Sequence, residues 1–510
     1  MNEALDPTGH WRKRTVIVML AACQLVLLSS VWPHFCSPNE CSRMFAADAF
    51  VPRGTFEIDP ELARYGFIDD VSASGGRHYS NKAPGLIFAA VPVIAVLHEL
   101  APTASIGTEI FVARSVLVSG AALVCALLLA SWVEHERPGP INPAGAAFIL
   151  LFASGFAVYA GTFFSHAWTG SLLFIAAYAV LGPKRNSTKW LDIAAGFCVA
   201  LAAVSEYPAA LVGVPLALAA SWGSWRRFAR MTAGALLPLA ALAVYDAACF
   251  GSPLTLSSRL EALPRYHRLA TQTFFGFTSP HPAALAGLLF SPLVGLFFFF
   301  PVLLPGILAP LLAWRLGHRR LAVAAGSAIW LLPVVMAGYR EWRGGAAFGP
   351  RYLVLAVPFF ILGLALLPVA RTRWWIIGAA VPSAAVAFLG RATPPFAIDA
   401  AWNASTLRGW VIPALEGGLW NHPLGLASVT WALVVLTAGL GLWLAAFWLA
   451  FTPTLRRMNR RTALAAAALA ALLLAIQLGA GQVTRRQRDW IRFITPSFTV
   501  RPSPHPPVRR

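Results

Sequence analysis

The sequence predicts an all-α polytopic membrane protein with about 13 membrane-spanning helices. Three observations predict this class. Of the 510 residues, 58% are hydrophobic and only 12% are charged. A soluble chain carries about twice that charged fraction. Apolar runs of about 20 residues recur along most of the chain, and each is long enough to cross a bilayer as a helix.

The net charge of +19 does not indicate a nucleic-acid partner, because its distribution fits a membrane. Basic residues form short clusters between the apolar runs, as cytoplasmic loops do. These clusters lie at 11–14, 183–190, 225–230, 315–320, 370–375 and 455–461. The first cluster predicts that the N-terminal segment 1–14 is cytoplasmic, and that the chain lies in the cytoplasmic (inner) membrane with the bilayer as a partner.

The first apolar run, 15–32, is long and lacks a small-residue cleavage site. It is therefore interpreted as a retained first span and not as a signal peptide. The polar segment 33–83 that follows is then external. It contains Cys36 and Cys41, which could form a disulfide there, although two unpaired thiols fit the sequence equally well.

From residue 166 onward, two apolar runs separate each basic cluster from the next. The predicted spans are 166–182, 191–205, 207–222, 231–249, 292–314, 320–338, 352–370, 374–391, 428–450 and 462–481. Between the first span and residue 166 an even number of crossings is required, yet three runs occur there, at 84–100, 109–133 and 142–163. We expect 84–100 to be a re-entrant or interfacial helix, because it is short and contains prolines.

These assignments divide the chain into a membrane core, external segments and a tail. The transmembrane core covers 84–391, an external loop covers 392–427 and the last two spans cover 428–482. The basic, proline-rich segment 483–510 is predicted to be an external tail.

The external segment 33–83 is too long and too charged for a simple connection, which favours a functional loop carrying juxtamembrane helices. A solvated loop with scattered charges is the simpler alternative. A second polar segment, "GYREWRGGAAFGPRYL" (338–353), is also external. Its arginines suit a phosphate or carboxylate, or they anchor the chain at the interface. His166 in "FFSHAW" could equally be a packing residue, and Glu206 in "SEYPAA" could simply order a turn.

Carboxylates, cations and aromatic residues thus gather at the outer face. This combination suits a lipid-linked phosphate donor, whose head group lies at that depth while its tail stays in lipid. A carboxylate would deprotonate an acceptor hydroxyl, and lysine and arginine would stabilise the phosphate leaving group. The sequence contains neither a phosphate-binding P-loop nor a dinucleotide-binding glycine motif.

Five segments in order carry a resemblance to a known superfamily. They read "SRMFAADAFVPRGTFEIDP" (42–60), "DDVSASGGRHYSNKAPGLIFAAVP" (69–92), "SHAW" with "SEYPAA", "CFGSPL" (249–254) with "LLFSPLVGLFFFFPVLL" (288–304), and "EWRGGAAFGPRYLVLAVPF" (341–359). The chain resembles GT-C superfamily glycosyltransferases that use polyprenyl-phosphate sugars, in particular the bacterial group related to protein mannosyltransferases and aminoarabinose transferases. The resemblance covers residues 15 to about 370.

The resemblance implies an inverting transfer of a hexosyl or pentosyl unit from a polyprenyl-phosphate sugar to an envelope lipid, glycan or protein. It implies that Asp70 is the catalytic base, with Asp69, Asp48 and Glu40 as alternatives, and that Lys82 faces the donor phosphate. The sequence departs from the superfamily pattern in two places, where the acid positions read Asn39-Glu40 and Asn81-Lys82.

The predicted substrate-binding residues are those that would hold the phosphate or line the sugar pocket. They are Arg43, His78, Tyr79, Lys82, His166, Glu206, Arg343, Arg351 and Tyr352. No cofactor and no metal ligand is assigned; a divalent metal is possible, but no ligand spacing supports one. A transporter or flippase of lipid-linked sugars and a catalytically inactive scaffold are the alternative functions.

Overall fold

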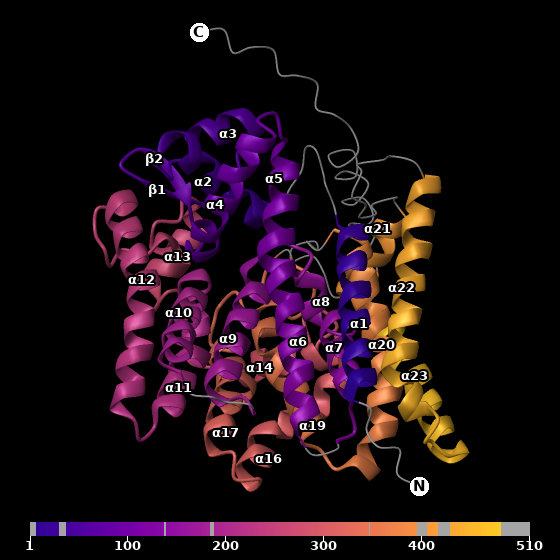
Figure 1. Cartoon of the computed structure of the whole chain (residues 1–510). Coiled ribbons are helices and arrows are strands. Elements are labelled where there is room, and N and C mark those ends of the chain that lie inside the picture. Colours follow the sequence, from indigo (N-terminus) through magenta and orange to yellow (C-terminus); the bar gives the residue numbers. More distant parts are fainter. Residues whose placement is uncertain are drawn as a thin grey trace.

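Helices form most of the chain, as its composition predicts. The computed structural model describes residues 7–29, 37–136, 139–183, 188–345, 347–394, 405–416 and 429–480. Figure 1 shows long, roughly parallel helices with a smaller group of short elements covering one end of part of the bundle. The predicted helical class is confirmed, with one small β-hairpin in addition.

Six helical stretches in the described part are long and apolar enough to cross a bilayer. They are Ile106–His135, Trp225–Phe250, Arg319–Met336, Thr372–Ala392, Leu433–Leu455 and Arg460–Gly479. Shorter apolar helices are Gly85–Leu100, Pro143–Phe152, Ser165–Leu181, Tyr207–Ser221, Pro301–Arg315 and Arg351–Ala365. The chain is therefore a multi-pass membrane protein, while thirteen crossings remain a prediction.

The elements follow the predicted runs closely. Those of the first half are α1 (Pro7–Leu27), α2 (Pro38–Arg53), α3 (Asp59–Tyr65), β1 (Val71–Ser74), β2 (Arg77–Ser80), α4 (Gly85–Leu100), α5 (Ile106–Ala113), α6 (Gly120–His135), α7 (Pro143–Phe152), α8 (Gly155–Tyr159), α9 (Ser165–Leu181), α10 (Lys189–Ser205), α11 (Ala210–Ser221) and α12 (Trp225–Phe250). A π-helical stretch, Arg114–Ser119, joins α5 to α6.

The second half is more broken. Its elements are α13 (Pro264–Gln272), α14 (Pro282–Phe290), α15 (Leu296–Phe299), α16 (Ala309–Arg315), α17 (Arg319–Gly326), α18 (Leu332–Met336), α19 (Val357–Ala365), α20 (Val369–Ala392), α21 (Ile412–Glu416), α22 (Val429–Leu455) and α23 (Arg460–Gly479). A 3₁₀ helix over Pro301–Leu308 joins α15 to α16, and another, Arg351–Ala356, precedes α19.

Two predicted runs are interrupted for identifiable reasons. The run 142–163 divides into α7 and α8 at Ala153 and Ser154. There the Ser154 hydroxyl donates a hydrogen bond to the Leu150 carbonyl oxygen at 2.8 Å, in the way that serine competes with a helical backbone. In the run 292–314, Pro301 and Pro305 lack the backbone donors that a regular α-helix requires.

The group of short elements, which we call the cap, comprises α2, α3, β1, β2 and α4 (Figure 1). Strands β1 and β2 are antiparallel, with Val71 opposite Ser80 and Ser74 opposite Arg77. Gly75 and Gly76 form the turn with φ of 56° and 77°. Such positive φ values at both central residues characterise the tight turns that match the twist of a hairpin.

Helix α4, expected to be re-entrant or interfacial, belongs to this cap and lies at the end of the bundle (Figure 1). Its first residue packs directly on α10, because a Cβ on Gly85 would lie 2.4 Å from the Ser205 Oγ atom. This contact brings the chain that follows the hairpin down onto the end of the bundle.

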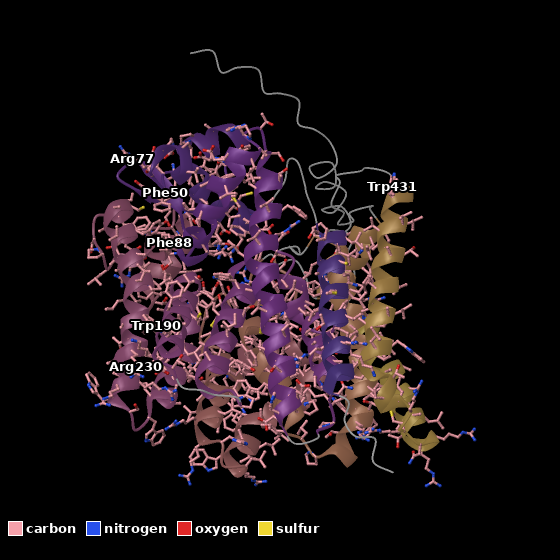
Figure 2. The ribbon with its side chains drawn as sticks, in the orientation of Figure 1. Phe50, Arg77, Phe88, Trp190, Arg230 and Trp431 are labelled. Carbon is pink, nitrogen blue, oxygen red and sulfur yellow. The ribbon has the colours of Figure 1, made fainter. Side chains whose placement is uncertain are left out.

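Figure 2 shows Phe50 and Arg77 of the cap at one end of the molecule and Trp190 and Arg230 at the other. The described part of the polar segment, 37–83, and the start of helices α10 and α12 thus lie at opposite ends, in agreement with opposite sides of a membrane. Which end faces the cytoplasm stays a prediction. The tail 483–510 and most of 392–427 lie outside the described residues, as does Cys36; Cys41 is buried in α2.

Candidate active site

A cavity of about 200 Å³ lies where the cap meets the bundle. Segments far apart in the sequence line it. Its lining residues are Ser37, Pro38, Asn39, Asp69, Asp70, Asn81, Lys82, Phe164, Glu261, Tyr266, Tyr339, Glu341, Gly344, Gly345, Arg351 and Tyr352. The lining is predominantly polar, with tyrosine rings among the charged groups.

Asp70 and Lys82 form an ion pair in this cavity, with 2.8 Å between Oδ1 and Nζ. Asp70 directly precedes β1 and Lys82 follows β2, so the antiparallel register of the hairpin brings them together. Burial alone would raise the pKa of Asp70, but Lys82 and, more weakly, Arg351 hold it below its usual value. The carboxylate is therefore ionised and positioned.

Arg351 contributes a second cation from a part of the sequence far from Lys82. Its Nη2 atom donates to the Tyr352 hydroxyl at 3.0 Å, while its buried Nε atom has no hydrogen-bond partner among the described residues. Gly344, at φ +80°, leaves room for this guanidinium, because a Cβ there would lie 3.1 Å from Nε. A buried guanidinium donor facing a cavity suits an anionic ligand.

A third cation, Arg43, lies behind the cavity wall. Its guanidinium donates to the Asn39 carbonyl oxygen at 2.9 Å and to the Ser165 Oγ atom at 3.0 Å. Burial lowers the pKa of Arg43 to about 10, against the raising effects of Glu206 and Asp70, so it stays charged at neutral pH.

Glu206 and His166 join this network, which supports the wall of the cavity from behind. The Ser165 hydroxyl donates to Glu206 Oε2. The His166 Nδ1 atom lies 3.4 Å from the same carboxylate, and its ring packs edge-on against Tyr352 with 6.0 Å between centroids. Neither residue lines the cavity.

Two carboxylates that line the cavity, Glu261 and Glu341, are not among the predicted site residues. Asn81 Nδ2 donates to Glu261 Oε2 at 2.8 Å. Burial raises the pKa of Glu261 to about 7, although Lys82 and Asn81 oppose the shift. Glu261 is the only carboxylate residue in the sequence between Asp246 and Glu341, and that isolation is the feature that could have identified it.

Two of the four predicted acids line the cavity, Asp70 and Asp69. Glu40 faces elsewhere: it is buried, and its Oε1 atom accepts a hydrogen bond from the Phe163 backbone N–H at 2.6 Å. Asp48 lies in a separate cluster described below.

Lys82, Arg351 and Tyr352 are the predicted binding residues that line the cavity. The other six do not line it. Arg43, His166 and Glu206 lie behind its wall, as described above, and the remaining three have other partners. His78 pairs with Asp59, with 2.6 Å between Nδ1 and Oδ1. The ring of Tyr79 packs against Phe250 in an aromatic cluster between β2 and α12. The guanidinium of Arg343 lies over the Trp342 ring, 5.2 Å from its centroid.

The sequence and the fold were compared with known proteins. No family model and no curated protein matches the sequence. Among the solved structures with a similar fold is ArnT from Cupriavidus metallidurans bound to undecaprenyl phosphate, with a TM-score of 0.46 and 15% identity over 91% of this chain and 77% of that one. The Archaeoglobus fulgidus oligosaccharyltransferase in the apo form has a TM-score of 0.45 and 11% identity over 99% of this chain and 62% of that one. Arabinosyltransferase EmbB from Mycobacterium smegmatis has a TM-score of 0.42 and 15% identity over 94% of this chain and 42% of that one.

All three are glycosyltransferases of the GT-C superfamily, the superfamily that the sequence motifs resemble. The chain spans less than two thirds of the oligosaccharyltransferase and of EmbB. Because every TM-score is below 0.5, the function proposed below rests on the cavity and its residues.

Proposed function

We propose that this chain is a membrane glycosyltransferase. It moves a hexosyl or pentosyl unit from a polyprenyl-phosphate donor to a lipid, glycan or protein acceptor at the outer face of the cytoplasmic membrane. The observation that carries the proposal is one cavity that holds the Asp70–Lys82 ion pair together with the guanidinium of Arg351, whose Nε atom has no hydrogen-bond partner among the described residues.

The two cations of the cavity fit the donor phosphate. Lys82 supplies a compact point charge, and Arg351 supplies donors that can grip two oxygens. When the sugar–phosphate bond breaks, the phosphate gains negative charge. Lys82 and Arg351 stabilise this charge more strongly in the transition state than in the ground state. The prenyl tail of the donor remains in lipid. Because the sugar is carried by this lipid and not by a nucleotide, the chain needs no nucleotide-binding domain.

The acceptor oxygen attacks the anomeric carbon from the side opposite the phosphate, so the configuration at that carbon inverts. A carboxylate takes the proton of the acceptor hydroxyl as the new bond forms. Asp70 is the proposed base, since it is ionised and close to Lys82. Glu261 is a second candidate, because a carboxyl whose pKa is about 7 is well matched to proton transfer near neutral pH.

The alternative of an inactive scaffold rests on Asn39 and Asn81, which occupy positions where related sequences carry acids. Both asparagines line the cavity, yet two carboxylates, Asp70 and Glu261, line it as well. The departures from the pattern therefore leave the cavity with groups able to accept a proton.

Binding of a polyprenyl phosphate to the purified chain tests the proposal. Lys82→Ala and Arg351→Ala should each weaken binding by about tenfold or more, because each removes a charge-assisted contact. The double variant should lose less binding free energy than the two single variants lose together, since both side chains contact one phosphate. Arg351→Lys should restore affinity only in part.

Arg340→Ala is the matched control, because Arg340 is an exposed arginine of the same segment and does not line the cavity. It should bind the lipid as the wild-type chain does. Folded Lys82→Ala and Arg351→Ala proteins with wild-type affinity would contradict the proposed phosphate site, and would favour a role for both residues as interfacial anchors.

A further inference from the structure

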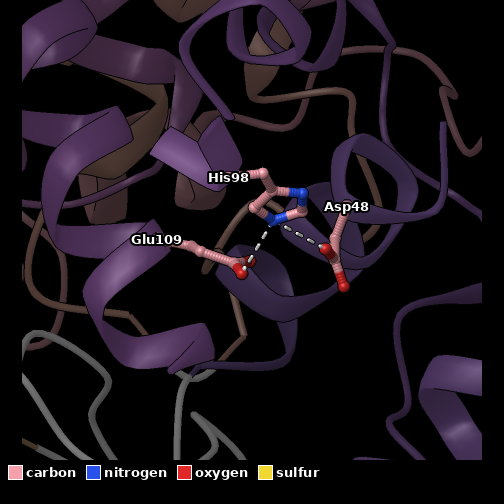
Figure 3. Close-up of side chains that lie close together, drawn as sticks. All are labelled: Asp48, His98 and Glu109. Carbon is pink, nitrogen blue, oxygen red and sulfur yellow. Dashed lines mark hydrogen bonds and ion pairs between the residues drawn. The ribbon is translucent and has the colours of Figure 1, made fainter. Parts of the chain in front are cut away.

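A second cluster of polar side chains, drawn in Figure 3, lies where helices α2 and α4 of the cap meet α5. It joins Asp48 of α2, His98 near the end of α4 and Glu109 of α5. The His98 Nε2 atom lies 3.3 Å from Asp48 Oδ1 and 3.2 Å from Glu109 Oε1. One ligand atom from each of the three residues lies within 4.8 Å of the others, and none of the three lines the cavity.

Hydrogen bonds within the cluster do not satisfy all of its carboxylate oxygens. Both carboxylates face the same nitrogen, and an imidazole nitrogen carries at most one hydrogen to donate. The second oxygen of Glu109, Oε2, is buried without a hydrogen-bond partner among the described residues, and the residue is only 4% exposed. A buried, unpaired carboxylate oxygen is costly, which indicates that another group completes the cluster.

The surrounding charges do not complete it. Arg53, the arginine on the same helix as Asp48, is already held by Glu61, with both guanidinium-to-carboxylate contacts at 2.8 Å. Arg64 lies over the Tyr65 ring, 4.9 Å from its centroid. Glu61 is itself a nearby negative charge that acts on Asp48, so the region favours a further cation.

We propose that Asp48, His98 and Glu109 bind one divalent transition-metal ion, with zinc the best match. One imidazole nitrogen and two carboxylate oxygens form a three-ligand set that suits Zn²⁺, and a water would complete a tetrahedral site. The imidazole would bind through the lone pair of Nε2, which then carries no hydrogen. The ion would neutralise both carboxylates at once.

Such an ion would fasten α2 and α4 of the cap to α5, the first part of the stretch Ile106–His135. Helix α2 also carries Arg43, and α4 begins three residues after Lys82. The proposed ion would thus hold the cap in place over the cavity without touching a donor or acceptor. Its role would be structural, independent of the proposed sugar transfer.

The test uses the full chain, purified in detergent with a tag that lacks histidine, stripped with a chelator and then exchanged into chelator-free buffer. Zinc is added, unbound metal is removed by gel filtration, and bound metal is measured by mass spectrometry. We expect one zinc per chain and a higher melting temperature with zinc than without it, because a ligand that binds only the folded state stabilises it. These measurements on the wild-type chain need no variant.

Asp48→Asn, His98→Gln and Glu109→Gln should each weaken zinc binding by at least about tenfold, as loss of a ligand does. His78→Gln is the matched control, since His78 in the same cap pairs with only one carboxylate, Asp59. It should retain stoichiometric zinc.

Two results would overturn the proposal. One is a wild-type chain that retains no stoichiometric zinc and melts at the same temperature with and without it. The other is wild-type zinc content in all three variants, which would locate the metal elsewhere. Loss of zinc in the three variants, with retention in His78→Gln, would establish the site.

Discussion

At the scale of single residues, two of the carboxyl groups that line the cavity, Asp70 and Glu261, differ in ionisation. The ion pair with Lys82 keeps the pKa of Asp70 low, so its charge is constant near neutral pH. Burial brings the pKa of Glu261 to about 7, so its charge changes there. If Glu261 takes part in proton transfer, turnover should depend on its ionisation, whereas Asp70 contributes no such dependence.

The pH dependence of turnover separates these roles. With Glu261 as the base, turnover should rise from about pH 6 to about pH 8, with an inflection near 7, because only the ionised carboxylate accepts a proton. Glu261→Gln should remove the inflection and lower the plateau. Glu341→Gln is the control, since Glu341 lines the same cavity but pairs with Arg265 at 3.1 Å. An unchanged inflection in Glu261→Gln would exclude Glu261 as the base.

Sequence reasoning located some residues of the cavity and misplaced others for a physical reason. Motifs identified Asp70, Lys82 and Arg351, which meet because a hairpin and a distant loop converge. The motif predicts that Tyr79, three residues from Lys82, lines the sugar pocket, but within β2 its side chain lies in an aromatic cluster with residues of α12. Successive strand residues point to opposite faces, so the direction of a side chain depends on a hairpin register that the motif does not specify.

At the scale of elements, close contacts at glycines fix the packing of the helices. Where α10 crosses α12, a Cβ on Gly196 would lie 1.9 Å from the Met231 carbonyl oxygen, and a Cβ on Gly234 would lie 1.9 Å from that of Ile193. Small residues allow such close backbone approach between membrane helices. This crossing therefore depends on glycine at both positions.

Gly196→Ala should destabilise the folded chain by about 1–3 kcal/mol, because the added methyl group must push two backbones apart. Thermal unfolding in detergent measures the change. Gly441→Ala in α22 is the matched control, since no atom lies within 4 Å of its Cβ position. Equal melting temperatures for Gly196→Ala and the wild-type chain would show that α10 and α12 are packed less closely than described.

Most helices could be predicted from apolar runs, whereas the interruptions and the hairpin could not be predicted from length alone. The glycine pair at 75–76 between short polar strands is a recognisable hairpin turn. Each strand has only four residues, however, which is too few to show a clear alternation of apolar and polar side chains. The breaks in α7–α8 and α15–α16 depend on serine and proline positions that a hydropathy average does not register.

At the scale of the whole molecule, the arrangement across the membrane can be tested by labelling single cysteines in intact cells. A cysteine at Ser74 of the hairpin should react with an impermeant reagent from outside, and one at Lys189 should react only after permeabilisation. The reason is that the cap and the first turn of α10, which begins at Lys189, lie at opposite ends of the bundle. Labelling at Lys189 from outside would contradict the predicted orientation.

The most direct test of the proposed sugar transfer compares envelope lipids, glycans and proteins by mass spectrometry. The cells should carry the wild-type chain, Asp70→Asn or no chain. We expect a species heavier by one sugar in wild-type cells, and its absence without the chain. With Asp70→Asn we expect a reduction of about 100-fold or more, as losses of a general base produce, while polyprenyl phosphate still binds. Identical envelope species with and without the chain would contradict the proposed transferase activity.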